Sequence, residues 1–201
     1  MLYPEFCDRF FVSRETFDRL DHYHSLLNKW QPHINLISPT TVPEIWSRHI
    51  LDCCQLYPLI ENKEGVIVDM GSGAGLPGLI LAILGCCDVH LIESDLRKTQ
   101  FLKEVSRTLS LSTTIHHGRI EQTTIKSVKY ITARALKPLT QLLAWSQHLA
   151  TEETICLFPK GKNYANELED ARKSWYFESL TQPNTVDNSG IVLIVKQIKP
   201  R

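Results

Sequence analysis

The stretch VDMGSGAGLPG, residues 68–78, constrains this chain more than any other feature, because it places four glycines within eight positions. A β-branched run ends just before it, and the apolar run 79–84 follows. A strand, a glycine turn and an apolar helix in this order present backbone N–H groups to a ligand that any Cβ would hold away. The stretch therefore predicts a cofactor site on an α/β sheet.

Short apolar runs alternate with helical patterns from residue 65 onward, which indicates a parallel sheet. We expect strands over 66–69, 89–93, 113–117, 130–133 and 154–158, and helices near 77–84, 95–109 and 139–149. The runs 175–181 and 191–198 are joined by a loop without a helix, as in an antiparallel hairpin. The predicted fold is α/β: the Rossmann-like sheet of class I methyltransferases that use S-adenosylmethionine (SAM), mostly parallel with a C-terminal antiparallel hairpin.

The residues before this sheet have helical periodicity. Apolar side chains between residues 17 and 30 share one helical face, and a second helix is expected over about 42–56. We predict a small N-terminal helical cap over residues 1–62 and a SAM-binding core over 63–201, folded as one compact unit.

The glycine spacing leaves the cofactor open between two classes. Gly73, Gly75 and Gly78 match a dinucleotide fingerprint, with Glu93 about 20 residues on to bind a ribose. SAM sites use the same turn and the same acid. Asp69, ahead of the glycines, suits the cationic amino-acid end of SAM better than a pyrophosphate, and the chain has no second domain for a dehydrogenase substrate, so SAM is favoured.

Two of these residues have simpler alternatives. Asp69 could only cap the N–H groups of the loop, as short acids often do. Glu93 could be an ordinary surface carboxylate at a strand end.

Charge and cysteine content indicate which partners and which cellular compartment to expect. The 22 basic and 22 acidic residues cancel, which argues against a non-specific nucleic-acid coat but allows a local basic patch. The sequence has no run long enough to span a bilayer, no signal-peptide pattern, and six cysteines without a C-x-x-C pair. We expect a cytoplasmic monomer without a membrane or metal partner.

Several blocks accompany the glycine loop in a specific order: R-H-x-x-D at 48–52, G-x-G-x-G-x-P-G at 71–78, I-E-S-D at 92–95, R-I-E at 119–121, T-A-R-A at 132–135 and K-G at 160–161. With this combination the chain resembles the bacterial small-subunit rRNA guanine-N7 methyltransferases (methyltransferase G), once called glucose-inhibited division protein B. The resemblance implies SAM contacts at Gly71, Leu76, Ile120, Glu121 and Arg134. It also implies that the methyl acceptor is N7 of one guanine in 16S rRNA of the small ribosomal subunit.

The chemistry agrees with this acceptor. Base-carbon methylation usually needs a Pro-Cys nucleophile, and exocyclic-amine methylation commonly uses an Asn/Asp-Pro-Pro-aromatic motif; the sequence has neither. Guanine N7 carries a lone pair and no proton, so orientation of the two reactants can suffice. No catalytic side chain is therefore expected.

Basic residues that follow the predicted strands, Lys137, Lys160 and Lys162, are candidates for RNA contact, and Arg48 and His49 could approach the same edge from the N-terminal helices. The lysines could equally be solvated loop residues, and Arg48 and Asp52 could form a structural link from the cap to the sheet. Two other functions stay open: methylation of a small molecule or protein, and a non-catalytic SAM fold that binds the ribosome.

Overall fold

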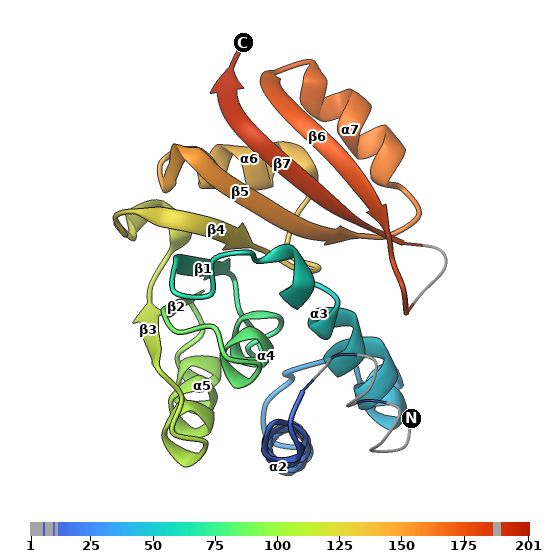
Figure 1. The fold of residues 1–201 in the computed structure, drawn as a ribbon, viewed down its shortest axis with the longest axis vertical. Helices are drawn as coiled ribbons and strands as arrows, with labels where there is room; N and C mark the ends of the chain where they lie inside the picture. Colours follow the sequence, from blue (N-terminus) through green and yellow to red (C-terminus); the bar gives the residue numbers. More distant parts are fainter. Residues whose placement is uncertain (1–5, 7–9, 11, 187–189) are drawn as a thin grey trace.

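A seven-stranded sheet in the order β3-β2-β1-β4-β5-β7-β6 organises the chain (Figure 1). The computed structural model describes residues 6, 10, 12–186 and 190–201. The strands are β1 (Val66–Met70), β2 (Val89–Glu93), β3 (Thr113–His117), β4 (Val128–Thr132), β5 (Ala150–Lys160), β6 (Trp175–Pro183) and β7 (Ile191–Pro200). Strands β1 to β5 pair in parallel, whereas β7 is antiparallel to both β5 and β6. The predicted fold class is confirmed.

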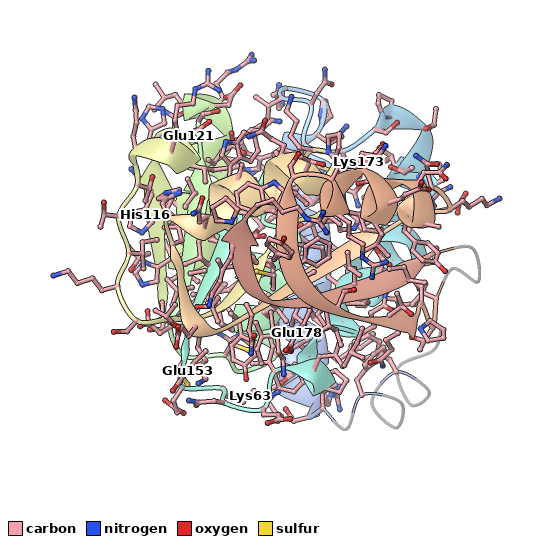
Figure 2. All side chains as sticks on the ribbon, turned by 90° about the horizontal axis from the view of Figure 1, so that it is seen from above. Lys63, His116, Glu121, Glu153, Lys173 and Glu178 are labelled. Atoms are coloured by element: carbon pink, nitrogen blue, oxygen red, sulfur yellow. The ribbon has the colours of Figure 1, made fainter. Side chains whose placement is uncertain are left out.

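Helices cover both faces of the sheet: α2 (Arg14–Trp30), α3 (Asp52–Cys54), α4 (Gly78–Ile83), α5 (Leu96–Thr108), α6 (Leu139–Gln147) and α7 (Tyr164–Arg172). Alternate residues of a strand face opposite sides, so Ile67 packs in the apolar cluster with α2, α4 and α5, and Val68 in the cluster with α6 and α7. Charged side chains such as Glu153 and Lys173 lie around the outside of the molecule (Figure 2).

The functional edge of the sheet follows from its strand order. The chain runs from β1 to β2 on one side and later returns to β4 on the other. Ligands of open α/β sheets bind outside the carboxyl ends of the strands at such a switch point. Met70 pairs with Ile92, and Asp69 pairs with Thr132. The segments that follow β1, β2 and β4 therefore meet at one edge.

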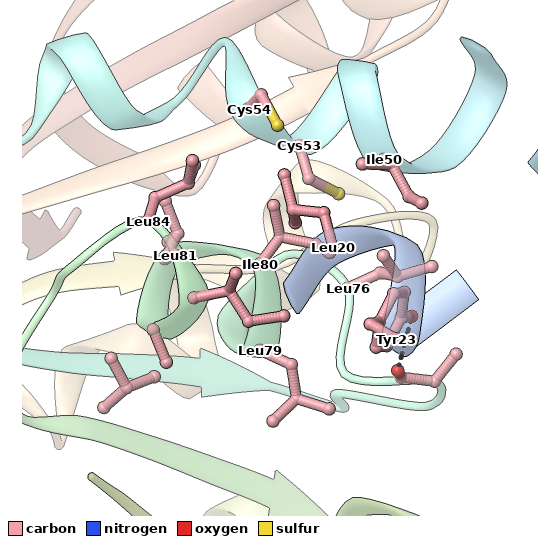
Figure 3. Close-up of a cluster of buried hydrophobic side chains, with 14 of the residues drawn as sticks. Leu20, Tyr23, Ile50, Cys53, Cys54, Leu76, Leu79, Ile80, Leu81 and Leu84 are labelled. Atoms are coloured by element: carbon pink, nitrogen blue, oxygen red, sulfur yellow. Dashed lines mark hydrogen bonds between the residues drawn. The ribbon is translucent and has the colours of Figure 1, made fainter. Parts of the chain in front are cut away.

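The cap packs against the helix that follows the glycine loop. Leu20 and Tyr23 of α2 are fully buried beside Leu79 and Ile80 of α4 (Figure 3). The Tyr23 hydroxyl donates a hydrogen bond of 2.9 Å to the carbonyl of Ala74 within the loop. The cap thus supports the glycine loop from outside the sheet. That residues 1–62 form a unit distinct from 63–201 stays a prediction.

The structure differs from the helices expected from the sequence in two places. The helix expected over 42–56 is broken into a 3₁₀ turn, Pro39–Glu44, a π-helical turn, Trp46–Leu51, and α3. Pro43 has no N–H to continue a helical ladder, and π turns are frequent at functional sites. Helix α7 was not expected from the sequence, because its apolar stripe is short: Tyr164 and Leu168 pack half-buried against the core, and Ala171 is buried.

Candidate cofactor and substrate site

The glycine loop adopts a backbone that side chains would disrupt. Gly71, Gly73 and Gly75 have φ angles of +65°, +56° and +81°. A Cβ at Gly71 would lie 2.5 Å from Leu136, but one at Gly73 would meet only the Gly71 carbonyl oxygen at 3.9 Å. Gly73 lines the first cavity described below. A side chain there would project into open space where a ligand can approach the backbone.

Asp69 lies beneath the loop. Its side chain is fully buried, and its Oδ2 accepts a hydrogen bond from the Gly78 N–H at 3.1 Å while its Oδ1 accepts one from the Thr132 hydroxyl at 2.9 Å. Burial raises the pKa of Asp69 to about 7, against the opposing effect of these hydrogen bonds. Asp69 is not among the residues that line the cavity. The structure therefore favours the alternative in which it caps N–H groups of the loop.

Glu93 ends β2 and faces the loop. Its Oε2 accepts from the Gly73 N–H and its Oε1 from the Asp95 N–H, both at 2.8 Å. An ionised carboxylate has about four lone-pair sites, so acceptor positions remain for hydroxyl donors. Glu93 is 8% exposed and lines the first cavity, which disagrees with an ordinary surface carboxylate.

The first cavity has a volume of about 540 Å³ at the carboxyl ends of β1, β2 and β4. It brings together most of the residues that the sequence predicts as cofactor contacts: Gly71, Gly73, Leu76, Glu93, Ile120, Glu121 and Arg134. Trp145, which the sequence does not identify, also lines it and donates from Nε1 to the Glu121 carboxylate at 2.6 Å. In the view of Figure 2, Glu121 lies at the upper left of the molecule.

A short segment of the cap closes one side of this cavity. Leu36, Ile37 and Ser38 line it. The Gln31 side chain accepts from the N–H groups of Leu36 and Ile37 at 3.0 and 3.1 Å, and donates to the Ile37 carbonyl at 2.8 Å. One amide side chain thus fixes the backbone of the segment, as a neighbouring strand would.

A second cavity, of about 710 Å³, adjoins the first. Both are lined by Thr41, His49, Arg134 and Ala135, which therefore form their common boundary. Ala135 has a φ of +51°, in the region that non-glycine residues rarely adopt. Such backbone strain is typical of functional sites.

Hydrogen bonds hold this boundary in place. We call Thr41, His49, Asp52 and Arg134 the dividing network. Arg134 donates from Nε to Asp52 at 2.7 Å and from Nη2 to the Arg48 carbonyl at 2.7 Å, and its Nη1 lies 3.1 Å from His49 Nδ1. The R-H-x-x-D block thus forms the structural link from cap to sheet that the sequence left as one alternative.

The tautomer of His49 follows from its partners. Arg134 can only donate, so His49 Nδ1 accepts and the ring proton is on Nε2, which donates to the Thr41 hydroxyl at 2.8 Å. Thr41 then donates to the Ser38 carbonyl at 2.8 Å. Burial, together with the nearby charges of Arg134 and Arg48, lowers the pKa of His49 to about 4. The ring is therefore neutral at physiological pH.

Asp52 also links this boundary to the C-terminal hairpin. Its Oδ1 accepts from Gln55 Nε2 at 2.8 Å and from Asn184 Nδ2 at 2.7 Å. Asn184 lies just after β6. Three segments far apart in the sequence thus meet at one carboxylate.

The predicted RNA-contact residues divide into two groups. Arg48, Lys137 and Lys162 are exposed. The Lys160 side chain is only 9% exposed, and its ammonium group donates to Glu167 at 2.7 Å and to the Lys137 carbonyl at 3.0 Å. Lys160 therefore ties β5 to α7, and its ammonium is not presented to solvent as a phosphate contact would be. Arg48, His49 and Lys160 line the second cavity and Lys137 lines the first, whereas Lys162 lines neither.

Other residues that line the two cavities are not among the site residues predicted from the sequence. Lys98 and Arg119 line the first cavity, and Glu44 and Ser47 line the second. Arg119 is the one most open to prediction, because it directly precedes Ile120.

Among the described residues, no group of three or more His, Cys, Asp or Glu side chains is arranged to hold a metal ion. Cys7 lies outside these residues. No helix within them has both the length and the apolar composition needed to cross a membrane.

Known proteins resemble this chain in sequence over most of its length. The family described as "GidB: rRNA small subunit methyltransferase G" matches residues 16–191. The ribosomal RNA small subunit methyltransferase G of Paramagnetospirillum magneticum is 48% identical over 188 residues, 93% of this chain and 91% of the relative. That of Rhodospirillum centenum is 46% identical over 197 residues, 98% of this chain and 91% of the relative.

Solved structures share the fold at low sequence identity. A TehB-like SAM-dependent methyltransferase from Corynebacterium glutamicum has a TM-score of 0.58 at 13% identity, covering 88% of this chain and 98% of its own. TYW2 of M. jannaschii, solved in complex with AdoMet, has a TM-score of 0.57 at 13% identity and covers 78% of each chain. The sequence matches decide the narrower question: this chain belongs to the GidB family, the rRNA small subunit methyltransferases G.

Proposed function

We propose that this member of the GidB family, a SAM-dependent methyltransferase of small-subunit rRNA, transfers its methyl group to N7 of one guanine of 16S rRNA in the cytoplasm. The observation that carries the proposal is the pair of adjoining cavities at the carboxyl edge of the sheet. A methyl donor in one and an acceptor base in the other would meet at the boundary made by the dividing network.

The first cavity fits SAM. Its volume lies in the range of small-molecule and cofactor sites. Gly73 leaves the backbone open to close approach, and Glu93 keeps acceptor positions for the two ribose hydroxyls. Leu76, Ile120 and Glu121 complete the proposed contacts. Asp69 acts from beneath by holding the loop.

The residues of the boundary suit an acceptor that needs no deprotonation. When bound, SAM supplies an electrophilic methyl group on its sulfonium. Both ring nitrogens of His49 are engaged, so it is not a free base. None of the described cysteines lines either cavity, and burial raises the pKa of the Cys53 thiol well above its usual value. The chain therefore contributes by binding and orienting the two reactants, which is enough for the lone pair of guanine N7.

Exposed cations beside the cavities support RNA binding despite the zero net charge of the chain. Arg48, Lys137 and Lys162 are exposed and would neutralise phosphates, while Arg134 stays within the dividing network. Affinity for RNA should therefore fall with increasing salt, with a slope set by the number of phosphate contacts.

Two measurements test the proposal. Isothermal titration with SAM and S-adenosylhomocysteine should show binding of both; heat from neither would leave only a non-catalytic ribosome-binding protein. Small subunits from cells that lack the protein should gain N7-methylguanine at one position, mapped by reverse transcription, on incubation with protein and SAM. Cofactor binding without rRNA methylation would favour a small-molecule or protein acceptor.

A further inference from the structure

We infer that the second cavity receives the target base and that Glu44 selects guanine by accepting hydrogen bonds from its Watson–Crick edge. This inference rests on the proposed function and deepens it. Enzymes that modify a base take it out of the helical stack into a pocket and read its Watson–Crick edge there. The second cavity is the space that adjoins the first across the dividing network.

The orientation of the base follows from the reaction. N7 has to face the first cavity, so the N7–O6 edge of the guanine lies at the boundary. Arg134 lines both cavities and has five N–H donors, of which three are used in the dividing network. Its remaining donors suit O6, the acceptor next to N7. The N1–H and N2–H₂ donors then point into the second cavity and need an acceptor.

Glu44 is the carboxylate available for that role. Among the described residues that line the second cavity, the carboxylates are those of Glu44 and Asp52. The Asp52 oxygens already accept from Arg134, Gln55 and Asn184. Glu44 is exposed, and within the described part of the chain its carboxylate has no hydrogen bond or ion pair.

A carboxylate at this position distinguishes the two purines. Guanine offers N1–H and an N2 amino group side by side, which match the two oxygens of a carboxylate. Adenine has an unprotonated N1 instead, so the same carboxylate would face a lone pair. A site that hydrogen-bonds an N–H of its substrate strongly rejects an analogue that lacks it. Selection of the base therefore falls to the second cavity.

The contact can be tested with two variants and a matched control. Glu44→Gln replaces one oxygen with a donor and Glu44→Ala removes the group, whereas Glu61→Gln changes another exposed glutamate of the cap outside both cavities. Methylation is measured with radiolabelled SAM on small subunits that lack the modification. We expect kcat/KM to fall roughly 10- to 100-fold for both Glu44 variants and to stay unchanged for Glu61→Gln, with SAM affinity and Tm of wild type throughout.

A substrate change separates direct contact from indirect positioning. RNA with inosine in place of the target guanine lacks the N2 amino group but keeps N7 and N1–H. Wild type should methylate guanine faster than inosine, because only guanine has the N2 amino group that the Glu44 carboxylate accepts from. Glu44→Ala should methylate both bases at similar rates, because the variant has no carboxylate for the amino group to contact. Equal kcat/KM for Glu44→Ala and wild type, or an unchanged guanine-to-inosine ratio, would overturn the assignment. Wild-type protein that binds SAM yet never methylates guanine N7 would overturn the proposed function itself.

Discussion

Replacement of Asp52 by asparagine tests whether the dividing network depends on a buried charge. The Asp52–Arg134 ion pair has an N···O distance of 2.7 Å, and the two side chains are 13% and 18% exposed. The asparagine would keep the shape of the aspartate side chain but leave the arginine without its counter-charge.

The expected loss follows from this burial. Removal of one partner of a buried ion pair costs about 3–5 kcal/mol, and the residual exposure of both side chains points to the lower end, about 3 kcal/mol. For a domain of this size each kcal/mol shifts Tm by roughly 2–4 °C. We therefore expect Asp52→Asn to lower Tm by about 6–12 °C in thermal unfolding followed by circular dichroism.

Two controls make the result decisive. The Lys129–Glu153 pair has the same N···O distance of 2.7 Å, but Glu153 is 80% exposed, so Glu153→Gln should leave Tm unchanged. Asp52→Asn combined with Arg134→Met should lose less than the sum of the two single variants, since no uncompensated charge remains. An Asp52→Asn variant as stable as Glu153→Gln, or additive losses in the double variant, would refute the reasoning.

Three further predictions concern the cofactor and pH. Gly73→Val should abolish SAM binding in isothermal titration without unfolding the chain, whereas Gly85→Ala, also at a positive φ but outside both cavities, should retain SAM affinity; normal binding by Gly73→Val would contradict the loop assignment. Glu93→Ala should weaken SAM about tenfold or more, because charge-assisted hydrogen bonds to the ribose are lost; an unchanged Kd would exclude this contact. The pKa of His49 is lowered from 6.5 to about 4, so the unfolded state binds its proton first as pH falls, and His49 destabilises the fold increasingly between pH 6.5 and 4. As pH falls from 6.5 to 4, the Tm of His49→Gln should decrease by less than the Tm of wild type. Plots of Tm against pH that run parallel for the two proteins would contradict a buried neutral ring.

Features encoded within a short stretch were predictable from the sequence. The strands of the parallel part coincide with short runs rich in apolar or β-branched residues, and β2 and β3 occupy the expected ranges. The glycine loop and Glu93 could be identified because a fixed spacing links them. Asp95 caps α5 through the N–H groups of Arg97 and Lys98, as its position before the apolar stripe predicts.

Features that depend on distant partners were not predictable. The Asp52 carboxylate meets Arg134 and Asn184, which lie 82 and 132 positions away in the chain. No local pattern specifies such a meeting. The same limit applies to Lys160, which the sequence places correctly at the end of β5 but whose partner Glu167 belongs to another element.

The position of β7 has a consequence for the order in which the molecule can fold. Since β7 lies between β5 and β6, β6 has no strand to pair with until residues 191–200 have been synthesised. Asn184 lies in the connection between these two strands, so the Asp52 carboxylate receives one of its donors only when that hairpin docks. Strands β1, β2 and β4, by contrast, pair with one another without either strand of the hairpin. We therefore expect the base-receiving side of a newly made chain to be completed last, so that a chain stopped before residue 191 should lack the Asn184–Asp52 link and be more sensitive to proteolysis than the full chain.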